Sequence, residues 1–359
     1  MMTSRERVEA AFAHRIPDRT PIFEYVLCSP VADQLLGRPY AVDETHWPEV
    51  VDALGWERAV RQRALDYLDL AQLLGHDLIY VTRRNVVRPN ISRSAPPVPE
   101  PEPPDDPVEF ISQRNRQRRE EWTPPSDDDY LVYHLLRDEM RRRDFDLPIL
   151  APACSHGIWT DTDLMQTMIL APELAHEHFQ IVTRATLANI EKYISAGVDQ
   201  ITVGGDFAGN RPIISPDCYR TFIVPEVRKC SRRIHQAGLK SVNASDGNLW
   251  PVIDDFFFGC EVDGYVEIDM HAGMDLGRLK KSFGDRITFY GNLDCGNILS
   301  FGSSEQIRRH VIATLEAGMG NGGHVLCASN AVTASISLDN YLTVVNTYRD
   351  FFSLPSLSI

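Results

Sequence analysis

From residue 147 onward, the chain alternates between short apolar segments with β character and longer amphipathic segments with helical character. Leu147–Ala153 is the first strand of this regular series, and Leu338–Phe352 is its last helix. Strands that alternate with helices at this spacing indicate parallel βαβ units. With two short strands nearer the N-terminus, strands are predicted near residues 22, 79, 149, 202, 241, 265, 289 and 325. Eight such units predict a single TIM-type (β/α)₈ barrel of the α/β class rather than an open sheet.

The helices of this barrel are marked by N-cap residues and by glycines that follow them. Ser215, and Ser303 or Ser304, are suitable N-caps. No Gly-x-Gly-x-x-Gly motif follows the first strand, so a dinucleotide-binding fold is not indicated. Helices are expected at 4–14, 47–75 with a break at Gly55, 161–170, 172–196, 215–238, 248–258, 274–283, 304–317 and 338–352.

The segment 95–107 is rich in proline and cannot form a helix or a central strand, because each proline removes a backbone donor and fixes φ. We interpret 90–130 as a long Pro- and charge-rich excursion from one barrel, because too little chain precedes it for a separate αβ domain. The arginines from Arg114 to Arg119 are expected on a solvated helix face. The whole chain, 1–359, is therefore expected to form one domain with an N-terminal helical segment.

The composition excludes several classes of partner. A formal net charge of -14 provides no basic excess for nucleic acid or an anionic membrane surface. The chain has no apolar run of about 18 residues, which a membrane span requires, and its N-terminus lacks the apolar stretch of a signal peptide. The seven cysteines form no Cys-x-x-Cys pair, which favours reduced thiols in the cytoplasm.

Polar side chains follow most of the predicted strands. In a barrel these positions surround the mouth at the C-terminal ends of the strands, where catalysis takes place. Crowded carboxylates raise one another's pKa, so that one of them can act as a general acid near neutral pH. Alternatively, some of them cap the following helices, as Asp246 and Asp294 could. The strand-end residues are Glu24, Cys154, His156, Asp206, Asn243, Ser245, Asp246, Glu267, Asp269, Asn292, Asp294 and Asn330.

A metal site and a cysteine nucleophile are two further interpretations of these positions. A zinc site needs three or four Cys, His or carboxylate ligands, and the available candidates are Asp246, Glu267, Cys327 and His156. A nucleophilic Cys154 assisted by His156 is the other interpretation, although cysteines at strand ends are more often core residues.

Several motifs resemble those of the uroporphyrinogen decarboxylase superfamily, over residues 3 to about 352. The superfamily contains tetrapyrrole decarboxylases and methyltransferases linked to corrinoids or thiols. The resemblance therefore implies a TIM barrel and an enzyme. The motifs are Thr3–Val8 with His14-Arg15 and Pro17-Asp18-Arg19, Gly205-Asp206 with Ile214-Ser215-Pro216, Ser245-Asp246-Gly247-Asn248, Gly273-Met274-Asp275, Gly291-Asn292-Leu293-Asp294, and Gly322-Gly323 with Ser329-Asn330.

Two departures from the superfamily patterns narrow the implied reaction. True decarboxylases carry an arginine-rich segment after the first strand that binds substrate carboxylates, but Phe23–Cys28 contains no arginine and places Glu24 there. The thiol methyltransferases bind zinc through His-x-Cys at the fifth strand and Cys at the eighth. The matching positions here are Asn243, Ser245 and Asn330. Cys327 lies nearby, but we expect it to turn outward in a regular strand.

The resemblance then implies a methyltransferase-like enzyme that passes a methyl group from a small methoxy or methylamine compound to a corrinoid (cobalamin) protein. A carboxylic acid would protonate the leaving atom. The alternatives are a carboxy-lyase acting on a tetrapyrrole or a small acid, and a non-catalytic binding barrel. The candidate acids are Glu24, Asp206, Asp246 and Glu267, and the candidate substrate-binding residues are Asn243, Asn292, Asn330, His156 and Tyr25.

Overall fold

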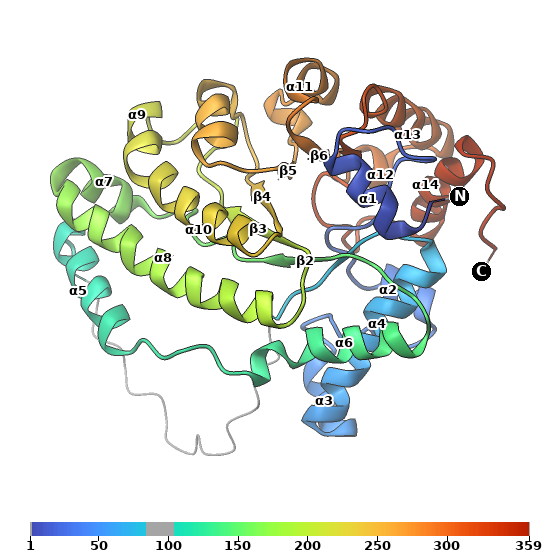
Figure 1. Cartoon of the computed structure of the whole chain (residues 1–359), viewed down its shortest axis with the longest axis horizontal. Coiled ribbons are helices and arrows are strands. Elements are labelled where there is room, and N and C mark those ends of the chain that lie inside the picture. Colours follow the sequence, from blue (N-terminus) through green and yellow to red (C-terminus); the bar gives the residue numbers. More distant parts are fainter. Residues whose placement is uncertain (1, 84–103, 359) are drawn as a thin grey trace.

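The computed structural model describes residues 2–83 and 104–358. Its strands pair in parallel and in chain order within one sheet (Figure 1). The strands are β1 (Ile79–Tyr80), β2 (Ile149–Pro152), β3 (Gln200–Gly204), β4 (Lys240–Ala244), β5 (Gly264–Val266), β6 (Thr288–Tyr290) and β7 (His324–Val325).

The predicted first strand closes this sheet into a barrel. Ile22 forms a parallel bridge with Leu326, just after β7. On its other side, the carbonyl of Ile22 accepts a hydrogen bond of 2.7 Å from the backbone N–H of Asp77, just before β1. The segment around Ile22 therefore lies between the last and the first named strands, and the predicted TIM-type barrel is confirmed.

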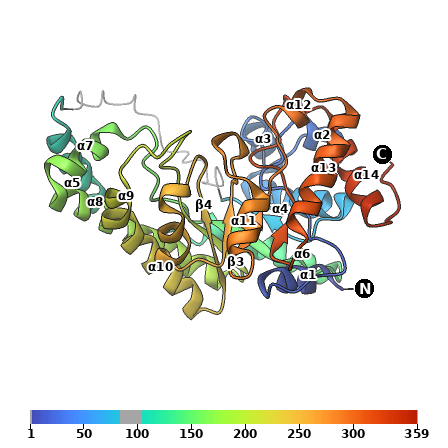
Figure 2. The same ribbon diagram turned by 90° about the horizontal axis from the view of Figure 1, so that it is seen from above.

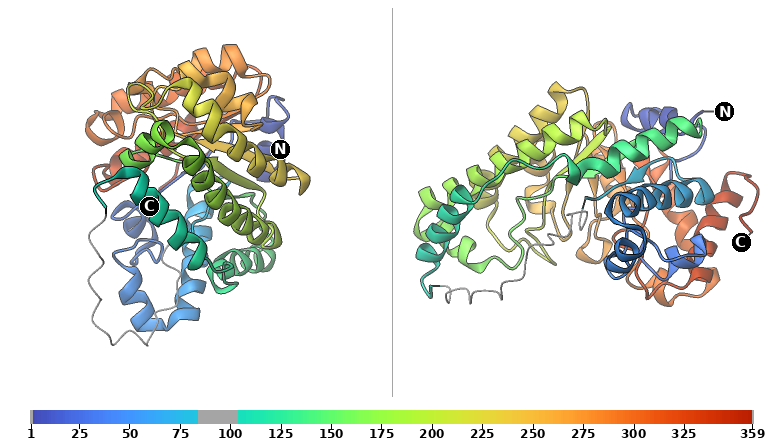
Figure 3. Two further views of the ribbon diagram at one scale, coloured as in Figure 1. Left: turned by 90° about the vertical axis from the view of Figure 1, so that its left-hand side faces the viewer. Right: turned by 90° about the horizontal axis from the view of Figure 1, so that it is seen from below.

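The helices surround the barrel, with α8 and α10 alongside β2 to β4 (Figure 1). Figures 2 and 3 show α5, α7 and the start of α8 extending away from the sheet. The α-helices are α1 (Ser4–Phe12), α2 (Val31–Leu36), α3 (Trp47–Leu54), α4 (Trp56–Leu74), α5 (Pro107–Glu120), α6 (Leu131–Arg142), α7 (Thr162–Leu170), α8 (Pro172–Ser195), α9 (Pro216–Cys218), α10 (Val224–Gln236), α11 (Leu276–Phe283), α12 (Ile298–Phe301), α13 (Ser304–Gly318) and α14 (Leu338–Phe351). The 3₁₀ and π segments are η1 (Asp128–Tyr130), η2 (Tyr219–Ile223), η3 (Trp250–Val252), η4 (Asp255–Gly259) and η5 (Met270–Ala272).

Most of the predicted helix boundaries are confirmed. Gly55 separates α3 from α4, and the side chains of Ser215 and Ser303 cap the following helices by accepting backbone hydrogen bonds. None of the helices in the described residues is long and apolar enough to cross a membrane.

The helix predicted at 248–258 is present from Trp250 onward, but it is irregular. The 3₁₀ turn η3, two α-helical residues and the π segment η4 follow one another without a break. The adjacent rings of Phe256 and Phe257 both contact Tyr265, with centroids 5.1 and 5.9 Å away. Neighbouring residues of a regular α-helix do not share a face, so the wider π-helical turn satisfies a packing requirement that an α-helix would not.

Residues 90–103 of the predicted excursion lie outside the described residues, and with them most of the Pro-rich segment 95–107. The arginine run after it belongs to α5, as predicted for a helix face. Arg114 on this helix forms an ion pair of 2.8 Å with Asp161.

The barrel interior and its N-terminal end are filled by apolar side chains. Val8 and Ala11 of α1 join one buried cluster with interior residues of several strands, such as Leu150, Val242 and Val325. Helix α1 therefore covers the N-terminal end of the barrel and leaves the opposite end open for a site.

Asp77 fixes the N-terminal segment to this closed end. Its side chain is fully buried and accepts hydrogen bonds from Arg7 at 3.1 Å, from Arg19 at 2.7 and 2.9 Å, and from the backbone N–H of Ile22 at 3.2 Å. A buried carboxylate paired with two guanidinium groups is compensated in charge. Loss of Asp77 would leave Arg19 without an ion-pair partner among the described residues, whereas Arg7 would keep Asp18 at 2.6 Å.

Candidate active site

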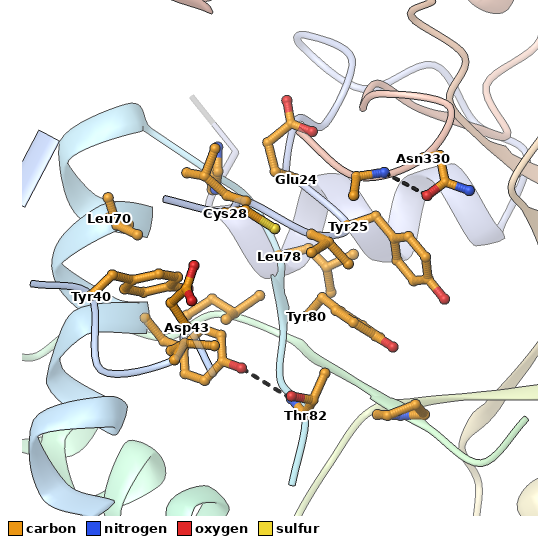
Figure 4. Close-up of a pocket in the computed structure, with 18 of the residues that line it drawn as sticks. Glu24, Tyr25, Cys28, Tyr40, Asp43, Leu70, Leu78, Tyr80, Thr82 and Asn330 are labelled. Carbon is orange, nitrogen blue, oxygen red and sulfur yellow. Dashed lines mark hydrogen bonds between the residues drawn. The ribbon is translucent and has the colours of Figure 1, made fainter. Parts of the chain in front are cut away.

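A cavity of about 590 Å³ lies at the C-terminal ends of the strands and extends to α4 (Figure 4). This volume suits a small-molecule ligand. Its wall combines carboxyl groups from the strand ends with tyrosines and an arginine from the N-terminal part of the chain. The polar and aromatic residues that line it include Glu24, Tyr25, Tyr40, Asp43, Arg63, Tyr67, His76, Tyr80, Thr82, Cys154, Asp206, Glu267 and Asn330.

Glu267 follows β5 and presents a carboxyl group to the cavity. Burial, together with the charges of Asp246 and Asp206, raises its pKa to about 8, although a hydrogen bond from Tyr25 acts in the opposite direction. Its backbone has φ of 72°, a left-handed conformation that is strained for a residue with a side chain. Such strain persists only where the surrounding structure enforces it, which is common at functional sites.

Asp206 and Asp246 lie beside Glu267 and are joined through a hydrogen-bonded chain. The backbone N–H of Asp246 donates to Asp206 Oδ1 at 2.9 Å, and Asn330 Nδ2 donates to Asp246 Oδ2 at 3.0 Å. Burial raises the pKa of Asp246 to about 7, with further contributions from Asp206 and Asp269. No backbone hydrogen bond to the Asp246 carboxylate is found among the described residues, so the interpretation of this residue as a helix cap is wrong. Asp294 is not a helix cap either: Asn297 is the N-cap of α12, and Asp294 makes a loop bond, accepting from the Asn297 N–H at 3.0 Å.

Glu24 lies deeper in the wall, just past the first strand. It is 8% exposed, and its Oε2 accepts a hydrogen bond of 3.2 Å from the Ala328 N–H. Burial raises its pKa to about 8. Three carboxyl groups of the site, those of Glu24, Asp246 and Glu267, therefore carry pKa values near or above neutrality.

Cys327 is close to Glu24, and the expectation that it turns outward is wrong. Cys327 belongs to the interior cluster with Val325, whereas the intervening Leu326 packs into a cluster with the outer helices. Side chains continue to alternate between the barrel interior and the outer helices after β7. This alternation does not extend to Asn330, because the chain leaves strand geometry after residue 328. Burial, with the charge of Glu24, raises the pKa of the Cys327 thiol.

Cys154 and His156 do not form a nucleophile–base pair. Cys154 opens to the cavity, and its thiol donates to Thr202 Oγ1 at 3.0 Å. Although the side chain is exposed to the cavity, the surrounding walls desolvate the thiol and raise its pKa to about 12, so the thiol is neutral. His156 points toward α8, where Nε2 lies 2.9 Å from Thr183 Oγ1, and burial lowers its pKa to about 4.

Three of the predicted substrate-binding residues do not line the cavity. His156 contacts α8, as described. Asn243 points to the outer face of β4, where Nδ2 donates to the Phe256 carbonyl at 3.0 Å. Asn292 donates to the Ile268 carbonyl at 3.4 Å and is buried. Tyr25 and Asn330, by contrast, line the cavity.

A zinc site does not fit this arrangement. Within the described residues, no three His, Cys, Asp or Glu side chains are grouped so that they could hold a metal ion. Of the four possible ligands, Asp246 and Glu267 are neighbours, whereas His156 faces α8 and Cys327 lies in the apolar interior.

Helix α4 and its neighbours contribute a wall of the cavity that was not predicted from the sequence. Arg63, Tyr67, Tyr40 and His76 line this side of the cavity. The available signal was the helical pattern: Arg63 lies three residues after Val60 and four before Tyr67, on the apolar face of α4. Exposure to solvent does not explain a charged residue on an apolar helix face, so such a residue indicates a structural or functional role.

Comparison with known proteins identifies similar chains. The family model for uroporphyrinogen decarboxylase (URO-D) matches residues 157–351, more than half of the chain. The uroporphyrinogen decarboxylase of Coxiella burnetii is 23% identical over 189 residues, which cover 50% of this chain and 48% of that protein. That of Xanthomonas axonopodis pv. citri is 30% identical over 158 residues, with coverages of 43% and 42%. The chain thus aligns with about half the length of these curated relatives.

A solved structure resembles the whole chain. The methyltransferase from Methanosarcina mazei superposes with a TM-score of 0.68 at 20% identity, covering 98% of this chain and 100% of that one. At this identity the similarity shows a shared fold.

Proposed function

Because this chain belongs to the uroporphyrinogen decarboxylase family, we propose that it is a methyltransferase that moves a methyl group from a small methoxy or methylamine compound to a corrinoid protein. Superfamily members include enzymes of this kind, and the fold extends over the full length of a methyltransferase. The observation that carries the proposal is the group of carboxyls with raised pKa values at one end of the cavity.

Glu267 is the proposed acid. It lines the cavity directly, and a pKa of about 8 keeps it protonated at neutral pH. Asp206 and Asp246 maintain this state, since their negative charge opposes ionisation of Glu267. Asn330 holds Asp246 in place.

The proposed step breaks the bond between the methyl carbon and the leaving oxygen or nitrogen. The electron pair of that bond stays on the leaving atom, and Glu267 supplies the proton that this atom needs. The corrinoid of the partner protein is the methyl acceptor and supplies the electron pair for the new bond to carbon. The demethylated compound leaves as a neutral alcohol or amine, and Glu267 regains its proton from solvent.

Carboxy-lyase activity is the second candidate, because the curated relatives are uroporphyrinogen decarboxylases. A tetrapyrrole with many carboxylates would meet Glu24 and Tyr25 where decarboxylases of the superfamily place arginines. This argues against uroporphyrinogen and leaves a small acid as the substrate of the lyase alternative. The third reading, a non-catalytic binding barrel, predicts neither reaction.

The test is an assay of the purified chain with a reduced corrinoid carrier protein and a panel of methoxylated aromatic compounds and methylamines. Methylation of the corrinoid, followed spectrophotometrically, is the expected result. Parallel incubation with uroporphyrinogen and with small carboxylic acids, followed by release of carbon dioxide, tests the lyase. Carbon dioxide release without methyl transfer would overturn the proposal in favour of the lyase, and no reaction in either assay would favour a binding protein.

A further inference from the structure

Arg63 is a buried guanidinium group in the wall that α4 contributes to the cavity. The residue is 1% exposed and lines the cavity. Its Nη2 donates to the carbonyl and hydroxyl oxygens of Thr82 at 3.2 and 3.0 Å, and its Nη1 donates to the Val42 carbonyl at 3.5 Å. Within the described residues, no carboxylate lies within 4.0 Å of this guanidinium.

These contacts leave part of the guanidinium unused. The group has five N–H donors, and the three hydrogen bonds to Thr82 and Val42 occupy at most three of them. Nε is buried and has no acceptor among the described residues. A buried charge normally has a counterion or a full set of hydrogen bonds, because desolvation without them is unfavourable. Arg63 has neither, so an acceptor from outside the described protein would complete its coordination.

Aromatic rings hold Arg63 in a fixed orientation. Its guanidinium lies 5.7 Å from the centroid of the Trp47 ring and 5.9 Å from that of Tyr67. A planar guanidinium that is fixed in this way can bind a carboxylate or phosphate through two parallel hydrogen bonds. Among the described residues that line the cavity, it is the single arginine or lysine.

We propose that Arg63 binds an anionic group of the substrate, a carboxylate or a phosphate, at the α4 end of the cavity. The inference rests on the proposed function, because it assigns the methylated substrate an anionic group opposite the carboxyl cluster. In Figure 4, Tyr40 and Leu70 lie on the α4 side, and Tyr25 and Asn330 lie on the other side. A substrate that spans the cavity can therefore contact both ends.

The side of the cavity away from α4 presents an aromatic surface that suits a flat ring. The rings of Tyr25 and Tyr80 lie 4.4 Å apart, and both line the cavity. Aromatic side chains provide apolar surfaces on which a planar ring packs. The substrate class is therefore a small aromatic acid that carries a methoxy or methylamino group, with its anionic group on Arg63 and its methyl-bearing atom near Glu267.

The acidic residues of the cavity are compatible with an anionic substrate. Glu24 and Glu267 are protonated at neutral pH, because burial raises both pKa values to about 8. Asp43, Glu44 and Asp206 also line the cavity. The Asp43 carboxylate accepts hydrogen bonds from Thr45 at 2.6 and 2.9 Å and from the Ser29 N–H at 3.3 Å. The charge facing the bound anion is therefore less negative than the number of acidic residues suggests.

The test measures binding without a corrinoid protein, so that it can fail or succeed independently of methyl transfer. Dissociation constants are measured calorimetrically for 3-methoxybenzoate, 3-methoxyphenyl phosphate and the neutral 3-methoxybenzyl alcohol. The expected result is that one or both anions bind wild-type protein at least about 10-fold more tightly than the alcohol, since charge-assisted hydrogen bonds are the stronger kind. The tighter of the two anions identifies carboxylate or phosphate as the preferred group.

Two variants test whether Arg63 causes the preference for anions over the alcohol. Arg63→Met is expected to weaken anion binding by about 10- to 100-fold and to leave binding of the alcohol nearly unchanged. Arg61→Met removes the same charge from an exposed position of the same helix and is expected to change neither. If Arg63→Met does not fold, Arg63→Lys replaces it and is expected to keep a reduced preference for anions. Equal binding of anions and alcohol by wild-type protein, no binding of any probe, or equal losses in the Arg61 and Arg63 variants would overturn the inference.

Discussion

Replacement of Glu24 by glutamine is expected to raise the free energy of unfolding, and the gain is expected to grow with pH. Glutamine keeps the shape of the side chain and an oxygen that can accept the Ala328 N–H. It cannot ionise. The substitution therefore removes one buried titration while leaving the packing of the barrel wall largely intact.

The magnitude follows from the shift in pKa. Folding raises the pKa of Glu24 from 4.5 to about 8, so the folded state holds the proton more tightly than the unfolded state. The stability associated with this proton is fully present below pH 4.5 and is lost as pH rises through about 8. At 1.36 kcal/mol per pKa unit, the loss is about 1 kcal/mol at pH 5 and about 5 kcal/mol at pH 9. The variant lacks this loss, so its advantage should increase by about 4 kcal/mol over this range.

The assay is urea unfolding at pH 5, 7 and 9, followed by tryptophan fluorescence. Glu44→Gln is the matched control, because Glu44 also lines the cavity but is exposed. The reasoning is refuted if the stability difference between Glu24→Gln and wild type stays constant from pH 5 to pH 9.

Three further predictions concern packing, charge and thiol reactivity. Gly204→Ala should lower the free energy of unfolding by about 2–4 kcal/mol in urea, because the new Cβ would lie 2.0 Å from Asn243 Oδ1 at φ of +82°; a smaller loss would contradict this. Asp77→Asn should cost about 3–5 kcal/mol and lower the thermal midpoint, since Arg7 and Arg19 lose their shared carboxylate; an unchanged midpoint would exclude it. Iodoacetamide should label Cys154 on the order of 1,000-fold more slowly at pH 8 than free cysteine, because its pKa is about 12; rapid labelling in mass spectra would show otherwise.

The barrel and its helix boundaries were predictable because they depend on local rules. Period-two apolar strands, N-cap serines and glycines such as Gly55 mark element ends regardless of what packs above them. The irregular form of the helix after Asn248 was not predicted, because packing decides it. Phe256 and Phe257 both contact Tyr265, and no local propensity reveals this requirement.

The candidate acids could be predicted because strand-end positions meet at one mouth. The same rule wrongly placed Asn243 in the cavity. Val242 and Ala244 belong to the interior cluster, so period-two alternation places Asn243 outside. Applying this alternation within β4 would have removed Asn243 from the cavity.

The rule that site residues follow the strand ends does not lead to Arg63, because Arg63 belongs to a helix before β1. The proposed role of Arg63 in anion binding depends on the hydrogen-bond acceptors that its guanidinium lacks. Only the arrangement of Thr82, Val42 and the aromatic rings around it shows that its Nε has no acceptor in the described residues.

The most direct test of the central claim is the pH dependence of kcat/KM for methyl transfer in wild-type protein and in Glu267→Gln. If Glu267 is the acid, wild-type kcat/KM should fall above about pH 8, where this group ionises. The variant should be about 10²- to 10⁴-fold slower at pH 7 and should lack that decline. A variant with the same rate and the same pH profile as wild type would contradict the assignment of Glu267 as the proton donor.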